Sequence, residues 1–451
     1  MRSDACLTMA EEAVIEPAQP NGEKTGIRRI IKNTGWLLGG KGFGGILSLF
    51  YLAILTRTLG VAGFGQFALI TGTAQAIALI VTFQTWQVVI RFGARNIKGA
   101  ENRQQFGRLV GLCTLLDIAG AVAGCILAYF AVGWLAPFFG WDQELAQNAL
   151  IFALVMLLSI KSTPTGILRV ENRFDLAAYA EAIIPTVRLI GTLIVWFTDP
   201  RLVNFLAVWA LSEVIHAIGY WLFAAWNSRD IMSPRNLFRV KRAARENRGI
   251  GEFLLISNLG STLAGLSQNI SLLIVGYFVG PTAAGLYRLA SQLSVAMTKI
   301  SVLLSRAIFA EVNLMRAQQG AEAMKVLFRK ASRMLFMTGG TVILIVVVIG
   351  QPALFYMSGP EFLPAYPLLI LLAAAASVDL AGAIYEPTLL SGSGARTALI
   401  LQATIAVLFI TMLLVGLHFF GATGAAGAML VAAVIRLVLF GVAARRNLAK
   451  G

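Results

Sequence analysis

Long apolar runs separated by short polar connections dominate the chain. An α-helix needs about 20 mostly apolar residues to cross roughly 30 Å of hydrocarbon. Twelve runs of about that length occur near residues 34–58, 66–90, 109–132, 145–168, 176–198, 202–226, 251–279, 287–310, 331–350, 365–386, 397–419 and 423–444. The pattern predicts an all-α membrane protein with about twelve transmembrane helices.

The composition agrees with this prediction. The 451 residues are 57% hydrophobic and 13% charged, whereas soluble domains keep about a quarter of their residues charged. The net charge of +15 would suggest a nucleic-acid partner in a soluble chain, but here the basic residues cluster in the connections. We therefore expect no nucleic-acid partner. The three cysteines show no CxxC spacing, so neither a disulfide framework nor a metal site is predicted.

Lys and Arg are distributed unevenly between the connections. Those after the second, sixth and eighth runs contain five, seven and five basic residues, whereas the opposite side contains Arg57 and Arg201. Basic connections remain in the cytosol. Both termini are therefore predicted to be cytosolic.

A midpoint connection and an internal repeat predict two lobes. Residues 227–250 form the longest basic connection and are predicted to link a six-helix lobe at 34–226 to a second at 251–444. LGVAGFGQFAL at 59–69 aligns with VGPTAAGLYRL at 279–289. The alignment pairs Gly60 with Gly280, Gly65 with Gly285, and Phe67 with Tyr287. Because each lobe begins and ends in the cytosol, the repeats are predicted to be parallel.

Short polar segments are expected at the two ends. Residues 1–33 contain prolines and acidic residues without an apolar core and are predicted to be a disordered cytosolic tail. Residues 445–451 are predicted to be a second cytosolic tail.

The first two runs resemble those of a known family. The stretches LLGGKGFGG at 37–45 and LAILTRTLGVAGFGQFAL at 52–69, followed by a helix that ends in a basic connection, are similar to the start of the oligosaccharide flippases and polysaccharide transporters. That family belongs to the superfamily that also contains the multidrug and toxin extruders and the lipid II flippases.

The resemblance implies an alternating-access carrier whose lobes surround a cationic central cavity. Its implied substrate is an undecaprenyl-pyrophosphate-linked oligosaccharide, moved across the bacterial inner membrane for O-antigen or exopolysaccharide synthesis. The implied partners are this lipid substrate, the membrane lipids, glycosyltransferases and a polysaccharide polymerase.

Four runs contain polar stripes at helical spacing, which predict a wet cavity. Gly, Ser and Thr also mediate close helix packing in membranes, so packing explains any single one of them equally well. Four stripes at equivalent places favour the cavity. The stripes are Lys41, Gly42 and Gly45; Thr71, Gln75 and Thr82; Asn258, Ser261, Thr262, Gly265 and Asn269; and Ser291, Thr298, Ser301 and Ser305.

Deep cations are the candidates for binding substrate phosphate. Lys299 lies about 11 residues from either end of its run, too deep to snorkel easily, and is the strongest candidate, followed by Lys41 and Arg306. Arg57 and Arg288 flank the repeated turn at the outer mouth, where they either guide release or anchor headgroups. The substrate-binding candidates are Lys41, Lys299, Arg306, Asn258, Ser261, Asn269, Gln75, Arg57 and Arg288.

Other deep charges have structural or coupling interpretations. Arg188 and Glu213 are predicted to form a buried pair that stabilises the first lobe, with Glu181 as a third member. Three acids either bind a coupling proton or sodium ion or neutralise Lys161 and Arg436. They are Asp117, Asp379 and Glu386.

No cofactor is predicted beyond such an ion. His216 and His418 are far apart in the sequence and are interpreted as packing or interface residues rather than metal ligands.

No enzymatic motif stands out, and we predict a transporter rather than an enzyme. The chain has no Walker A motif, and GFGG at 42–45 is interpreted as a helix-packing motif. A multidrug–ion antiporter of the same superfamily is the alternative, but a cavity for organic cations should be lined with acids and aromatics. An O-antigen ligase or polymerase is less favoured, because it should have a large periplasmic loop and the outer connections here are short.

Overall fold

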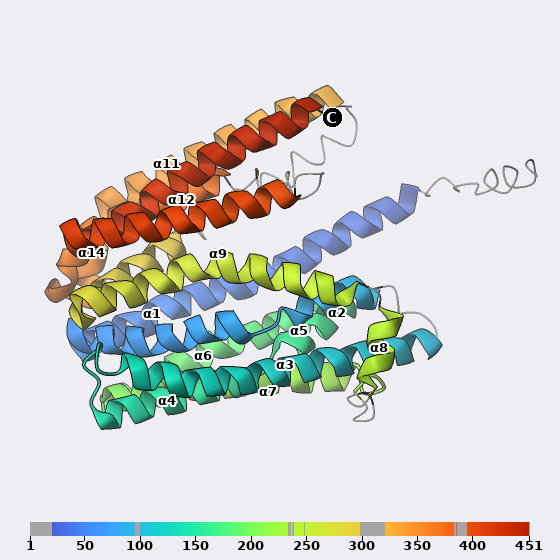
Figure 1. Cartoon of the computed structure of the whole chain (residues 1–451), viewed down its shortest axis with the longest axis horizontal. Helices are drawn as coiled ribbons and strands as arrows, with labels where there is room; N and C mark the ends of the chain where they lie inside the picture. The colour runs from blue at the N-terminus through green and yellow to red at the C-terminus, as the bar shows by residue number, and fades with distance from the viewer. Residues whose placement is uncertain are drawn as a thin grey trace, which may run out of the picture.

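The computed structural model describes residues 20–94, 100–232, 236, 239–247, 249–297, 321–382, 385 and 395–450. Within these residues the secondary structure is helical and no strand occurs (Figure 1). The long helices run side by side along the long axis of the molecule. Eight spans in these residues are long and apolar enough to cross a membrane, and two of them, Gly44–Gly93 and Ile400–Ala443, include a bend at a glycine.

The helices account for every predicted apolar run, the eighth through its described part at 287–297. The predicted all-α fold with about twelve membrane helices is confirmed. The first half contains α1 (Pro20–Val81), α2 (Thr85–Gly93), α3 (Ala100–Leu135), α4 (Gln143–Leu158), α5 (Ser162–Val170), α6 (Phe174–Thr198) and α7 (Leu202–Asn227). The rest contains α8 (Val240–Glu246), α9 (Ile250–Val279), the helical residues 281–297, α11 (Ala321–Ser358), η3 (Pro360–Ala365), α12 (Tyr366–Gly382) and α14 (Ala395–Lys450).

Glycines with positive φ angles separate consecutive membrane helices. Gly60 divides α1 at a φ of 65°, and Gly421 divides α14 at 58°. Gly280, aligned with Gly60 in the repeat, follows α9 at a φ of 104°. A residue with a side chain would be strained at these φ angles, so glycine is the residue that allows each turn.

The second and fourth predicted runs are each broken, which corrects the expectation of continuous helices. Residues 82–84 separate α1 from α2, and residues 159–161 separate α4 from α5. Asp117 of α3 lies between the breaks and accepts hydrogen bonds from the hydroxyl of Thr85 at 2.8 Å and the backbone N–H of Thr163 at 3.0 Å. The carboxylate binds a free backbone donor at the start of α5 and a side-chain hydroxyl at the start of α2, and it complements the dipoles of both helices.

The predicted disordered tail is wrong for residues 20–33, because α1 begins at Pro20. At the other end, α14 continues to Lys450, into the predicted second tail. No proline follows Pro20 before the membrane run, and extending a formed helix costs far less than nucleating one.

The predicted linker contains a helix of its own, α8. Glu246, at its end, forms an ion pair with the buried Arg108 of α3 at 2.7 Å. Hydrogen bonds from the Arg108 guanidinium lower the pKa of Glu246. The pair attaches the linker to the first half of the chain.

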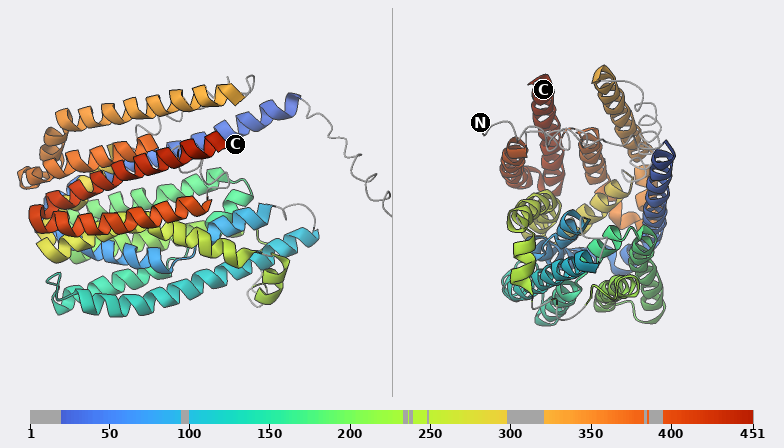
Figure 2. Two further views of the ribbon diagram at one scale, coloured as in Figure 1. Left: turned by 45° about the horizontal axis from the view of Figure 1, so that its top comes forward. Right: turned by 90° about the vertical axis from the view of Figure 1, so that its right-hand side faces the viewer.

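Helix α9 lies between two groups of helices. Helices α1 to α7 contact one another, and α12 contacts both α11 and α14. Helix α9 contacts α1 on one side and α14 on the other (Figure 2). The division into lobes at 34–226 and 251–444 remains a prediction.

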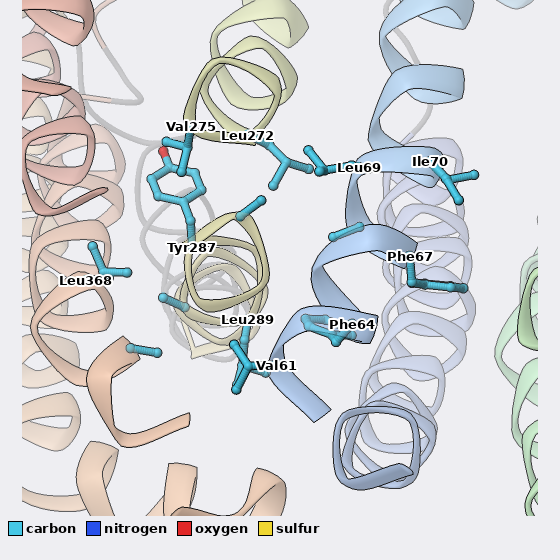
Figure 3. Packing of buried hydrophobic residues seen from close by; sticks show 14 of the residues in the cluster. Val61, Phe64, Phe67, Leu69, Ile70, Leu272, Val275, Tyr287, Leu289 and Leu368 are labelled. Carbon is cyan, nitrogen blue, oxygen red and sulfur yellow. The ribbon is translucent and has the colours of Figure 1, made fainter. Parts of the chain in front are cut away.

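The two halves share one hydrophobic core near the repeated turns. Phe64 and Leu69 of α1 belong to the same buried cluster as Leu272 of α9 and Leu368 of α12 (Figure 3). Tyr287, which aligns with Phe67 in the repeat, is also buried in this cluster. Packing at this level joins the halves.

Two aligned glycines allow the repeated turns to touch backbone to backbone. A Cβ atom at Gly65 would lie 1.9 Å from the carbonyl oxygen of Pro281. A Cβ atom at Gly285 would lie 2.6 Å from the carbonyl oxygen of Val61. Neither position accepts a side chain without separating the halves.

Replacing Gly65 tests this contact. Gly65→Ala should lower the thermal unfolding midpoint of the purified protein, because overpacking of this kind costs about 1–3 kcal/mol. Gly133→Ala in α3 is the matched control, since its Cβ would meet no atom within 4 Å. Equal unfolding midpoints for the two variants would contradict the account.

Candidate functional site

Arg57 lies three residues before the bend of α1 at Gly60 and binds the end of α11. Its guanidinium donates to the carbonyl oxygen of Met357 at 3.1 Å and to that of Tyr356 at 2.5 Å. The neighbouring Thr56 donates to the hydroxyl of Ser358 at 3.0 Å. Sequence reasoning offered release or headgroup anchoring for Arg57 and missed this contact between distant segments.

Two predicted substrate residues, Arg288 and Gln75, lie together. Nη2 of Arg288 is 3.4 Å from Oε1 of Gln75. Arg288 lies eight residues after Gly280, or about 12 Å along a helix at 1.5 Å per residue. It is therefore inside the protein rather than at the mouth. Within the described residues, no carboxylate forms an ion pair with Arg288.

Glu213 forms the predicted pair with Arg188 and a second pair with Lys161. Nη2 of Arg188 is 2.9 Å from Glu213, and Nζ of Lys161 binds the other carboxylate oxygen. The alternative in which Asp117 neutralises Lys161 is wrong, because Asp117 binds the starts of α2 and α5. The contact with Arg188 is present, and its structural role remains a prediction.

An aromatic pair lies beside Arg188. The guanidinium of Arg188 lies over the ring of Trp209, 4.9 Å from its centroid. Trp209 meets the ring of Tyr51 edge-on at 5.2 Å. Arg188 and Arg288 come from the two predicted lobes, one from each. Guanidinium groups bind phosphate oxygens through charge-assisted hydrogen bonds.

The remaining predicted residues have varied outcomes. Asp379 pairs with Arg436 at 2.9 Å, which agrees with the expectation that this acid neutralises Arg436. Asn258 accepts a hydrogen bond from the backbone N–H of Gln84 at 2.8 Å, and Asn269 donates within its own helix to Gly265 at 3.3 Å. Lys299, Arg306 and Glu386 lie outside the described residues, as do the side chains of Lys41 and Ser261.

A cavity of about 270 Å³, lined by both apolar and polar residues, lies beside the two helix breaks. Sequence reasoning missed it because it averaged hydropathy over each run. The polar interruptions at 82–85 and 159–163 were the available signal. The polar lining includes Thr82, Gln84, Asp117, Lys161, Glu181, His216 and Tyr220.

Comparison with known proteins settles the family. Residues 30–309 match the model of a family described as polysaccharide biosynthesis protein, which is more than half of the chain. The chain belongs to this family. The inner membrane protein YghQ of Escherichia coli (strain K12) is 28% identical over 344 residues, covering 76% of this chain and 96% of that protein.

Solved transporters share the fold of this family member. An inward-facing multidrug resistance MATE family transporter of the MOP superfamily has a TM-score of 0.68 at 17% identity, covering 90% of this chain and 95% of that chain. The lipid II flippase MurJ in an inward closed conformation also has a TM-score of 0.68, at 13% identity, covering 90% of this chain and 86% of that chain. The family resemblance predicted from residues 37–69 is confirmed.

Substitutions at Glu213 and Arg188 test the buried ion pairs. Glu213→Gln should reduce the amount of folded protein in the membrane more than Arg188→Gln, because it leaves two cations without a carboxylate. Removing one partner of a buried pair costs about 3–5 kcal/mol. Size-exclusion profiles of the detergent-extracted protein measure the folded fraction.

The double variant completes this test. Arg188→Gln with Glu213→Gln should be less harmful than the sum of the single changes, by about 0.5–3 kcal/mol. Additive losses would argue that the two residues do not stabilise each other.

Proposed function

We propose that this protein is a flippase for an undecaprenyl-pyrophosphate-linked oligosaccharide. It moves this lipid from the cytosolic to the periplasmic leaflet of the bacterial inner membrane, for O-antigen or exopolysaccharide synthesis. It performs no covalent chemistry, and both of its termini are cytosolic. The observation that carries the proposal is the interior position of Arg288, beside Gln75 and without a carboxylate partner among the described residues.

The charges near the lobe interface favour an anionic substrate. Lys161 and Arg188 both pair with the carboxylate of Glu213, and Arg288 forms no ion pair with a carboxylate among the described residues. A cation inside a membrane protein is costly unless it is paired or faces water or a ligand. A pyrophosphate that joins a lipid to a sugar is charged on both phosphates at neutral pH, so it supplies the missing negative charge.

The outer contacts fit a gate that closes above this substrate. Arg57, Thr56 and Gly65 join α1 to the second half of the chain near the repeated turns. In an alternating-access cycle these contacts separate to release the sugar-bearing headgroup, while the polyprenyl tail stays in lipid. The similarity to YghQ, an inner membrane protein, and to solved transporters supports this cycle.

A multidrug–ion antiporter is the alternative with the same fold. The likeness to MATE family transporters favours it, but cations at the lobe interface repel a cationic drug. For the flippase we propose coupling to a proton or sodium ion through Asp117, Asp379 or Glu386. The glycosyltransferases and polymerase that make and extend the oligosaccharide are its proposed partners.

Substitution of Arg288 tests the proposal. Arg288→Ala should reduce surface polysaccharide at least tenfold in a strain that depends on this protein, because one of the two phosphate-binding guanidinium groups is lost. Arg288→Lys should retain part of the activity, since the charge remains while the bidentate geometry is lost.

The matched control is Arg201→Ala. Arg201 is exposed in the turn between α6 and α7 and pairs locally with Asp199, so its loss should leave the polysaccharide unchanged. Wild-type polymer from Arg288→Ala at normal membrane levels would overturn the proposal.

A further inference from the structure

The cavity beside the helix breaks has no role in phosphate binding as described so far. Its volume is about 270 Å³. Glu181 and Thr82 are exposed and line it, so it is open rather than sealed. A small polar ligand can enter it.

His216 points to such a ligand. Its side chain is buried, at 3% relative exposure, and neither ring nitrogen has a hydrogen-bond partner among the described residues. The ring packs against Tyr220 at 5.0 Å, and both residues line the cavity. A neutral imidazole has one donor and one acceptor, and burying both unpaired is costly. The occupant should therefore both donate and accept hydrogen bonds.

The other lining groups offer the same mixture. Glu181 accepts from the hydroxyl of Tyr220 at 2.9 Å and retains capacity for further donors. Lys161 binds Glu213 through one of its three donors and retains two. Trp86 adds an aromatic ring, which is held by Gln84 at 2.8 Å.

We propose that this cavity binds one sugar ring of the lipid-linked oligosaccharide. Sugar hydroxyls both donate and accept hydrogen bonds, so they can pair with His216, Glu181 and Lys161. An aromatic ring packs against the apolar face of a sugar. A phosphate fits less well, because Glu181 and Asp117 face the same space. An organic cation also fits less well, because the positive charge of Lys161 faces this space.

The position of the cavity fits a sugar next to the pyrophosphate. Lys161 lines the cavity and shares Glu213 with Arg188. His216 lies three residues after Glu213 on α7, on the same face of the helix. A headgroup bound at Arg188 and Arg288 would therefore place its first sugars at this cavity. The inference rests on the proposed function.

Binding measurements on two lipids test the inference. Protein in nanodiscs is titrated with undecaprenyl pyrophosphate, which lacks sugar, and with lipid-linked oligosaccharide extracted from the native strain. His216→Ala and Glu181→Gln should each weaken binding of the sugar-bearing lipid about tenfold and leave undecaprenyl pyrophosphate unaffected. Arg288→Ala should weaken both.

Two further variants serve as controls. His418→Ala removes the other histidine of the chain, which is exposed, and should change neither affinity. His216→Asn retains a donor and an acceptor, so it should bind the sugar-bearing lipid more tightly than His216→Ala and should fold if the alanine variant does not.

Three results would overturn the inference. Equal losses for both lipids in the Glu181 and His216 variants would assign the cavity a general structural role. Unchanged affinities would mean that it holds only water. Glu181-dependent binding of tetraphenylphosphonium would assign it to organic cations. If the wild-type protein binds neither lipid, the proposed function fails together with this inference. The three results above overturn only the inference, so the two failures are distinguishable.

Discussion

One carboxylate, that of Glu213, neutralises two cations that come from different parts of the first half of the chain. Arg188 lies on α6, and Lys161 lies in the break between α4 and α5. An unpaired charge in the membrane interior is expensive, so both contacts restrict where these segments can lie. They hold Arg188 over Trp209 and keep Lys161 at the edge of the polar cavity. The phosphate site and the sugar site proposed above both depend on this arrangement.

The helix breaks require a second polar arrangement. A broken helix leaves backbone donors and acceptors without partners, which is tolerated inside a membrane only where protein groups or water satisfy them. Asp117 binds the starts of α2 and α5, and Asn258 of α9 accepts from the backbone of Gln84. The indole of Trp221 donates to the carbonyl oxygen of Ile160 at 2.9 Å. These contacts keep the breaks, and the cavity beside them, in place.

Features that depend on local pattern were predictable from the sequence. Apolar run length gave the helices, and the glycine repeat indicated where the turns at Gly60 and Gly280 would occur. The Arg188–Glu213 contact followed from similar depth on two helices joined by a short turn. The breaks did not follow, because two polar residues in each scarcely change the mean hydropathy of a long run. The partners of Lys161 and Arg57, and the unpaired His216, depend on how distant helices meet, which periodicity does not specify.

Transport in proteoliposomes tests the central claim most directly. Purified protein is reconstituted with lipid-linked oligosaccharide labelled on its sugar, and the outward movement of the label is measured by a membrane-impermeant glycosidase. The account predicts that the protein accelerates this movement at least tenfold over protein-free vesicles, while ethidium crosses at the background rate. Accelerated ethidium movement with no movement of the lipid would contradict it.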